Sequence, residues 1–210
     1  MINEEYTNFL KFFKAKHDES FVLEPGVGKV LVCAPHSVTH VREGKTLFSE
    51  PHSGALARLL HKYLNCPVIY KTKNCNDDAN YDVPSPFKDE LCNYVKNNGI
   101  QCVIDLHQLS PHRAPYVEIG TNGGANLIDS AHYDIIVSAL TNNLAYPIYT
   151  DKLFKASRPY TIGNYVHSTC NVSCIQIEIQ SNLLSLDSAI CSVEQIFEAL
   201  KFAIDKINSF

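Results

Sequence analysis

Short apolar runs alternate with segments of helical periodicity along the chain. Helices are predicted in five segments, which span 5–17, 53–65, 86–98, 129–144 and 192–208. Apolar or β-branched runs predict strands at 29–35, 67–71, 101–106, 116–120, 147–150 and 172–179. This alternation predicts an α/β fold with a mostly parallel mixed sheet and helices on both of its faces.

Polar, turn-rich segments separate these elements. The segments 36–51, 72–85 and 151–171 are predicted to be mainly irregular, and Ser53 is the expected N-cap of the second helix. Internal repeats, low-complexity tracts and linkers are absent from the sequence. We therefore expect residues 1–210 to form a single domain.

Composition places the chain among ordinary globular proteins. Apolar residues make up 45% and charged residues 19%, and the net charge of −4 gives no general attraction to nucleic acid. Apolar runs fall short of the roughly 20 residues that a membrane helix needs, and the N-terminal segment lacks a signal-peptide core. We therefore expect a cytoplasmic protein without nucleic-acid or membrane partners, whose oligomeric state the sequence leaves open.

The eight cysteines favour reduced thiols that pack as small apolar groups. A CxxC motif is absent, and a chain of this length does not need disulfides to build a core. Cys170 and Cys174 have a spacing that metal sites use, but a second pair with finger-like spacing is missing.

Polar residues with metal-binding or acid–base chemistry fall at the carboxyl ends of three predicted strands. His36 follows the strand at 29–35, His107 follows the strand at 101–106 with Asp105 two positions earlier, and Glu178 lies in the last strand. In open α/β sheets, ligands bind outside the carboxyl ends of the strands. These side chains are therefore the candidates for a functional site.

Glu178 has two interpretations on pattern alone. Glu178 alternates with Ile177 and Ile179 and therefore points to the same side of the strand as Gln176 and Gln180. If the strand lies at the edge of the sheet, that side is exposed to solvent. A central strand would bury the carboxylate, which would then need a partner such as a metal ion or a bound water.

The histidines and a nearby glutamate fit the donor set of zinc. Catalytic zinc takes about three nitrogen or oxygen ligands and keeps one position open. His36, Glu50 and His107 provide them if the strand ends are adjacent, while His40 and Glu43 are alternatives for the third ligand. Asp105 lies on the same side of its strand as His107, where it either orients that imidazole or contacts the substrate.

Five short motifs resemble the N-formylglutamate amidohydrolase family, which shares the zinc-carboxypeptidase-like fold of succinylglutamate desuccinylase and aspartoacylase. The motifs are Pro35-His36-Ser37, Glu50 with Gly54-Ala55-Leu56, Asp78-Ala79-Asn80, Asp105-Leu106-His107 and Gln176-Ile177-Glu178. In this order, the five motifs and the strands that carry them span residues 29–180. The resemblance implies one zinc ion, held by two histidines and an acidic ligand that match His36, His107 and Glu50.

The resemblance also implies catalytic and substrate-binding roles. Glu178 matches the catalytic glutamate, and Asp78, Asn80 and Asp105 belong to motifs at the substrate. Two departures stand out. The acidic ligand lies three residues after the first histidine in zinc carboxypeptidases but fourteen residues after it here, and Tyr81 follows Asn80 where the family often has a substrate-binding arginine.

The expected reaction is hydrolysis of an amide bond in a small N-acyl amino acid or a short peptide. Zinc would polarise the carbonyl and activate a water, and Glu178 would accept the water proton. An arginine suits a substrate carboxylate because its fork contacts both oxygens. Arg158 is the first candidate, Arg113 the second, and Arg42 also lies in a predicted loop.

Three other function classes compete with this expectation. One is a carboxypeptidase-like metallopeptidase, and another is a binding protein that keeps the fold and the metal without turnover. The third is a serine or cysteine nucleophile hydrolase, which is disfavoured because a G-x-S-x-G motif is absent and Cys33 lies inside an apolar run.

Overall fold

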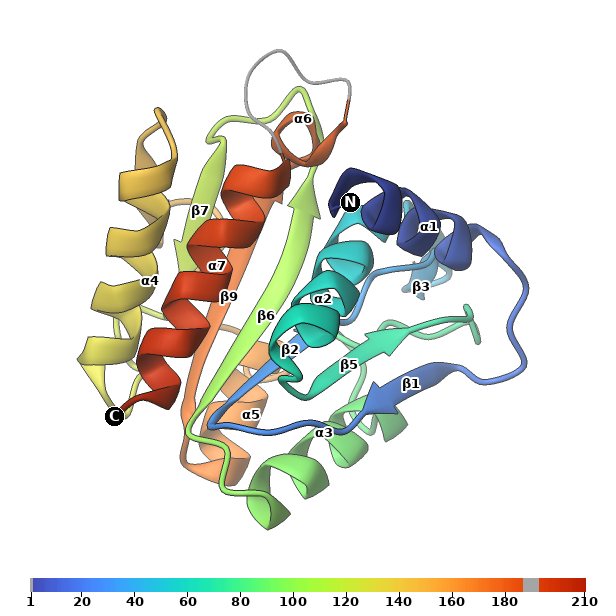
Figure 1. The fold of residues 1–210 in the computed structure, drawn as a ribbon. Coiled ribbons are helices and arrows are strands. Elements are labelled where there is room, and N and C mark those ends of the chain that lie inside the picture. The colour runs from blue at the N-terminus through green and yellow to red at the C-terminus, as the bar shows by residue number, and fades with distance from the viewer. Residues whose placement is uncertain (1, 187–192) are drawn as a thin grey trace.

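The sheet is mixed and mostly parallel. The computed structural model describes residues 2–186 and 193–210. Within them the strands of the sheet are β1 (Phe21–Glu24), β2 (Val30–Ala34), β5 (Val68–Lys71), β6 (Cys102–Leu109), β7 (Val117–Gly120), β8 (Ile148–Thr150) and β9 (Ser173–Gln180). They lie in the order β1-β5-β2-β6-β9-β7-β8 (Figure 1). Strands β5, β2, β6 and β9 are mutually parallel, β1 and β7 run antiparallel to their neighbours β5 and β9, and β8 is parallel to β7.

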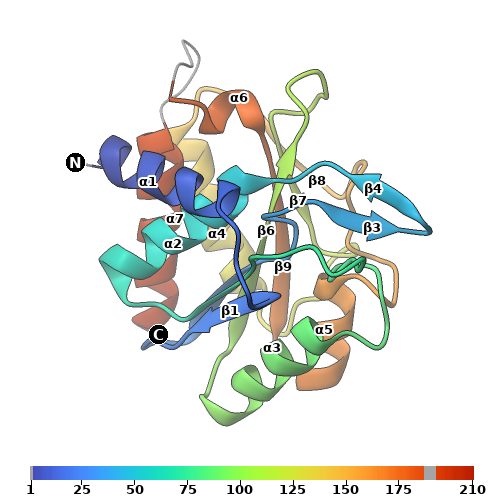
Figure 2. The same cartoon turned by 90° about the vertical axis from the view of Figure 1, so that its right-hand side faces the viewer.

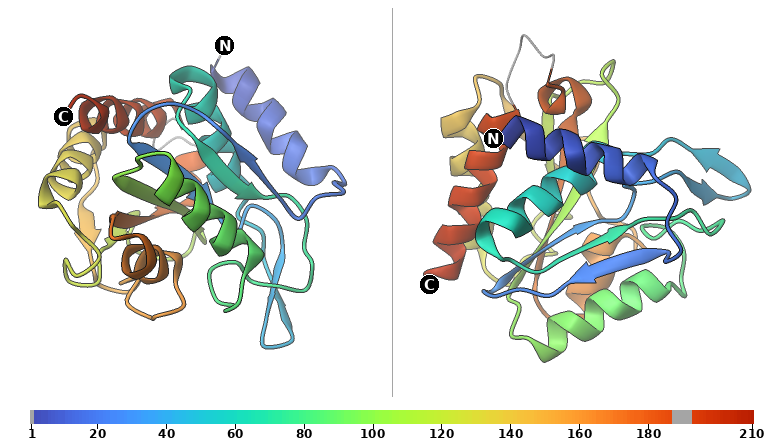
Figure 3. Two further views of the ribbon diagram at one scale, coloured as in Figure 1. Left: turned by 90° about the horizontal axis from the view of Figure 1, so that it is seen from below. Right: turned by 45° about the vertical axis from the view of Figure 1, so that its right-hand side comes forward.

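Helices cover both faces of this sheet, which confirms the predicted fold class. They are α1 (Ile2–Lys14), α2 (Pro51–Leu64), α3 (Pro86–Asn97), α4 (Ser130–Asn143), α5 (Ile162–Cys170), α6 (Ser181–Leu184) and α7 (Val193–Asn208). The larger apolar core lies between the sheet and α1, α2, α4 and α7, and the smaller core lies under α3 and α5 (Figures 2 and 3). In the described part of the chain, every helix is too short or too polar to cross a membrane.

Strand alternation turns polar groups toward the face that α3 and α5 cover. On that face β6 presents Val103 to the smaller core and then Asp105 and His107 toward its carboxyl end. Gln176 and Glu178 of β9 are the register partners of these two residues, so all four side chains point to the same side of the sheet. The carboxyl half of this face therefore carries the polar groups.

The structure corrects several predicted element boundaries. The segment 36–51 contains a hairpin of β3 (His40–Arg42) and β4 (Lys45–Leu47), and the segment 151–171 contains α5. Helix α5 has the β-branched and glycine content of a weak helix former, and packing of Ile162 and Val166 against the smaller core stabilises it. The short strand β1 was not predicted. The last helix was predicted to start at residue 192, which lies outside the described residues. Within them, α7 begins at Val193.

Helix α2 begins two residues earlier than predicted. Pro51 occupies its first position and Glu50 is the N-cap, so the predicted N-cap Ser53 lies inside the helix. The Ser53 hydroxyl donates instead to the Glu50 carbonyl oxygen at 2.7 Å. This start of the helix fixes the backbone of Glu50.

Candidate active site

His36 and Glu50 are neighbours in space although fourteen positions separate them in sequence. The β3–β4 hairpin accounts for the intervening residues and projects from the body of the protein (Figure 2). The ends of this insertion meet, because the Glu50 amide donates to the His36 carbonyl oxygen at 2.8 Å. The long spacing is therefore compatible with a shared site.

The structure brings the three predicted metal ligands together. One Glu50 oxygen lies 3.1 Å from His36 Nδ1, and the other lies 3.1 Å from His107 Nδ1. One ligand atom from each of the three residues lies within 4.8 Å of the others. The Gln108 amide donates to Glu50 Oε2 at 2.9 Å and holds the carboxylate between the two rings.

Each imidazole has a buried carboxylate behind it. His36 Nε2 lies 2.8 Å from Asp78 Oδ1, and His107 Nε2 lies 3.3 Å from Asp105 Oδ2. Both aspartates have 0% exposed surface. Metal-binding histidines commonly donate their second ring N–H to a carboxylate, which fixes the ring and raises its basicity. Asp78 and Asp105 are therefore placed to orient the two histidine rings, which was one of the two roles expected for Asp105, and the expected substrate contacts of both aspartates stay predictions.

The electrostatics of the cluster suit a divalent cation. Burial lowers the pKa of both histidines, but Glu50 with Asp78 or Asp105 outweighs burial and raises the pKa of His36 and of His107. Burial raises the pKa of Glu50, and the two histidines more than offset it, so that pKa lies well below its usual range. A divalent cation held by these residues would have two imidazole nitrogens and a carboxylate as ligands, which is a common donor set for zinc.

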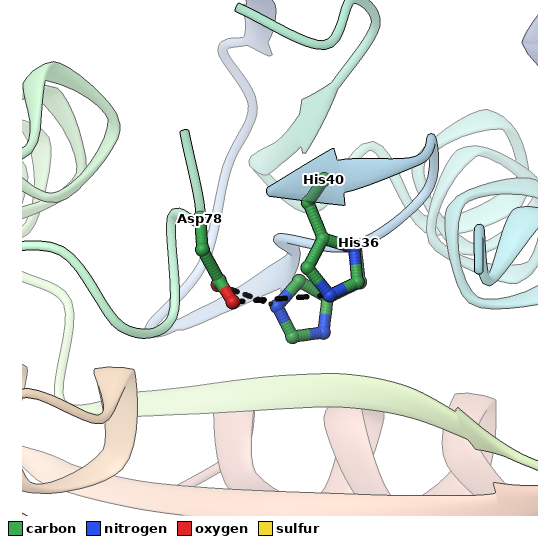
Figure 4. A group of neighbouring side chains, drawn as sticks. All are labelled: His36, His40 and Asp78. Atoms are coloured by element: carbon green, nitrogen blue, oxygen red, sulfur yellow. Dashed lines mark hydrogen bonds and ion pairs between the residues drawn. The ribbon is translucent and has the colours of Figure 1, made fainter. Parts of the chain in front are cut away.

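His40 belongs to a second cluster that suits a cation less well. Its ring stacks on the His36 ring with centroids 3.8 Å apart, and His36, His40 and Asp78 form a group with metal-ligand geometry (Figure 4). However, the Asp78 oxygen nearest to His40 is Oδ2, at 3.8 Å from His40 Nε2, and Arg42 Nη2 lies only 2.7 Å from the same oxygen. The guanidinium charge repels a cation there. The alternative ligand Glu43 instead accepts from the Tyr81 hydroxyl.

Glu178 is buried on a central strand, so the solvent-exposed interpretation is wrong. Its strand β9 lies between β6 and β7, and the side chain is 6% exposed. Burial raises the pKa of Glu178 to about 8, although the charge of His107, its register partner, acts to lower that pKa. Gln176 Nε2 donates to Glu178 Oε1 at 3.0 Å and orients the carboxylate. A buried carboxylate with a raised pKa is a candidate for acid–base chemistry.

A pocket of about 610 Å³ opens over these residues. Its walls include His36, Glu50, His107 and Glu178, together with Asn80. Asn80 Oδ1 accepts from the Ile162 amide at 2.7 Å, and Asn80 Nδ2 lies 3.4 Å from His107 Nε2. Asn80 therefore joins α5 to the metal-ligand cluster.

All three predicted substrate-binding arginines line this pocket, but their surroundings differ. Arg42 is held by Asp78. Arg113 and Arg158 are exposed, and the described residues offer neither of them a carboxylate within ion-pair distance. These two cations are free to contact an anionic ligand.

Two residues of the site were not predicted. Lys155 lines the pocket, and Glu118 is the fully buried register partner of Glu178 on β7. Glu118 Oε1 accepts from the amides of Leu153 and Phe154 and so holds the segment 151–161 against the pocket. Glu118 lies between valine and isoleucine in its strand, much as Glu178 lies between two isoleucines, and this pattern was available in the sequence.

Gly120→Ala is expected to displace the segment 151–161. A Cβ atom at Gly120 would lie 2.3 Å from the Phe154 carbonyl oxygen, which belongs to the backbone and cannot rotate away. We expect the free energy of unfolding to fall by about 1–3 kcal/mol, because the backbone of the segment must shift to make room for the new Cβ atom. Thermal denaturation measures the loss of stability, and limited proteolysis within the segment detects its displacement. A variant with wild-type stability and wild-type proteolysis would contradict the close packing of this segment on Gly120.

Comparison with known proteins supports the fold. Protein-family models do not match this sequence, and curated proteins also give no match. Solved structures do match. A gene product from Agrobacterium tumefaciens is 15% identical, with 91% of this chain and 96% of that chain covered and a TM-score of 0.63.

Two hydrolases have the same fold. N-formylglutamate amidohydrolase from Ralstonia eutropha JMP134 is 12% identical over 90% of this chain and 96% of that chain, with a TM-score of 0.59. A bacteriophage poly-gamma-glutamate hydrolase is 12% identical over 93% of this chain and 91% of that chain, with a TM-score of 0.56. The predicted resemblance to N-formylglutamate amidohydrolase is confirmed at the level of the fold.

Proposed function

We propose that this chain is a zinc-dependent amidohydrolase that cleaves the amide bond of an N-acyl amino acid. The observation that carries the proposal is the arrangement of His36 and His107. Each ring turns Nδ1 toward Glu50 and Nε2 toward a buried aspartate. Such an arrangement is costly to build and is typical of a metal centre with oriented ligands.

His36, Glu50 and His107 are the proposed zinc ligands. A zinc ion held there would supply Lewis acidity to the scissile carbonyl and to the attacking water. Glu178 lies beside His107 on the same face of the sheet, where its carboxylate accepts the proton of the water and delivers it to the leaving nitrogen. Gln176 keeps that carboxylate oriented.

Cationic side chains select the substrate in this proposal. Arg113, Lys155 and Arg158 line the pocket, and the described residues provide no carboxylate partner for them. A carboxylate on the substrate would neutralise them and be oriented by the planar guanidinium groups. The poly-gamma-glutamate and N-formylglutamate hydrolases that share the fold are named for substrates that contain glutamate.

A cysteine mechanism has little support from the geometry. Cys33 is fully buried, donates to Asp105 at 3.3 Å, and has a pKa raised by burial and by that carboxylate. The thiolate form that attacks a carbonyl is therefore disfavoured.

Chelation tests the proposal directly. We expect dialysis against a chelator to abolish hydrolysis of N-formyl- and N-acetylglutamate, and stoichiometric zinc to restore it. A panel of short peptides assayed in parallel separates amidohydrolase from carboxypeptidase-like activity. Hydrolysis that persists after the metal is removed would contradict the zinc mechanism, and a zinc-loaded protein without turnover on either substrate class would favour a binding function.

A further inference from the structure

Apolar side chains stand exposed at the rim of the pocket. Phe48 is 94% exposed and Leu153 is 64% exposed, and both line the pocket together with Leu47 and Phe154. Exposed apolar surface that borders a concave site is typical of a ligand-binding region. A ligand that covers these side chains gains the free energy of removing them from water.

The backbone holds these apolar side chains in fixed places beside the catalytic groups. Phe48 lies between β4 and Glu50, and the Glu50 amide is bonded to the His36 carbonyl. Leu153 and Phe154 donate their amides to Glu118, the register partner of Glu178. Phe48 is thus anchored beside the proposed metal ligand Glu50, and Leu153 and Phe154 are anchored beside Glu118, the neighbour of the proposed base Glu178.

The cations lie with the second of these segments. Lys155 follows Phe154 directly, and the Arg113 guanidinium lies 5.6 Å from the centre of the Phe154 ring. Phe48 lines the same pocket from the other segment, two positions before Glu50. A substrate whose carboxylate binds these cations and whose amide lies at the proposed metal ligands would therefore have its acyl group on the Glu50 side, within reach of Phe48. The rim at Phe48 is apolar, so it favours an acyl group of the same character.

The pocket has room for an acyl group larger than formyl. A volume of about 610 Å³ lies within the range of roughly 300–1,000 Å³ that is usual for sites of drug-sized ligands. A formyl group would leave Phe48 in water and much of this space unfilled.

We propose that the substrate is an N-acyl amino acid with a bulky apolar acyl group, which packs against Phe48 on the Glu50 side of the pocket. This inference rests on the proposed amidohydrolase function and narrows its substrate class. Phe48 is a specificity-determining residue in this proposal, because its contact with the acyl chain separates long from short acyl groups.

The test compares N-acetylglutamate with N-octanoylglutamate on the zinc-loaded protein. We expect kcat/KM to favour the octanoyl substrate in the wild type, and Phe48→Ala to reduce the octanoyl-to-acetyl ratio about tenfold or more. Phe202→Ala is the matched control, because Phe202 is 59% exposed on α7, far from the pocket lining. The control is expected to leave the ratio unchanged.

A binding measurement separates failure of this inference from failure of the proposed function. Calorimetric titration of N-octanoylglutamate into Glu178→Gln needs no turnover, and the Phe48→Ala change is expected to weaken that binding about tenfold or more. An octanoyl-to-acetyl ratio or an octanoyl affinity that Phe48→Ala leaves unaltered would overturn the apolar acyl site. Absence of hydrolysis with Phe48-dependent binding would instead refute the amidohydrolase function and retain the acyl site.

Discussion

Replacing Glu178 with glutamine is expected to lower kcat for amide hydrolysis by about 10²- to 10⁴-fold while zinc stays bound. Glutamine keeps the size of the side chain but cannot take up a proton. Glu178 is not among the proposed zinc ligands, so the metal content should match that of the wild type. Steady-state kinetics on N-acylglutamates and metal analysis of the same samples measure the two quantities.

Glu118→Gln is the matched control for this experiment. Glu118 is also a buried glutamate, it pairs in register with Glu178, and it holds the Leu153 and Phe154 amides through one oxygen. Glutamine retains an oxygen for those amides, so kcat should fall far less than in Glu178→Gln. Full activity of Glu178→Gln would end the assignment of Glu178 as the base. Equal losses of kcat in the two variants would show that activity depends on the buried carboxylates in general and not on proton transfer by Glu178.

The strand pattern predicted the sheet, and the predicted site required that the ends of these strands be adjacent. The apolar runs ending at His36 and His107 and the run containing Glu178 became β2, β6 and β9, which are adjacent in the sheet. Adjacent parallel strands in register place His107 beside Glu178 without further assumptions. Local periodicity, which a single sequence contains, predicted the three strands, but their order in the sheet comes from the structure.

The remaining parts of the site depend on contacts between distant loops. Asp78 reaches His36 from a polar segment, and Arg42 reaches Asp78 from a hairpin that replaces a predicted loop. Glu50 joins the cluster because that hairpin closes on itself, as the bond between Glu50 and His36 shows. Periodicity does not report such closures, since they are determined by tertiary hydrogen bonds rather than by local propensity.

Replacing either His36 or His107 with alanine is expected to yield protein without stoichiometric zinc and without hydrolytic activity. Each variant leaves two of the three proposed ligands, and the carboxylates that oriented the missing ring lose their partner. Asp105→Asn should act more mildly, with zinc affinity lower by about 10- to 100-fold, because it alters only the group behind His107. Metal analysis and competition with a zinc-binding dye measure these differences, and thermal denaturation confirms that each variant is folded.

His40→Ala is the discriminating control, because His40 stacks on His36 and belongs to the competing cluster. If Glu50 is the third ligand, Glu50→Ala loses zinc and His40→Ala keeps it. The opposite result would move the ion to His36, His40 and Asp78, where Arg42 would have to leave its place on the aspartate. Undiminished zinc in both His36→Ala and His107→Ala would exclude a metal centre in either cluster. Both clusters contain His36, so an ion that stays bound after His36 is removed lies elsewhere.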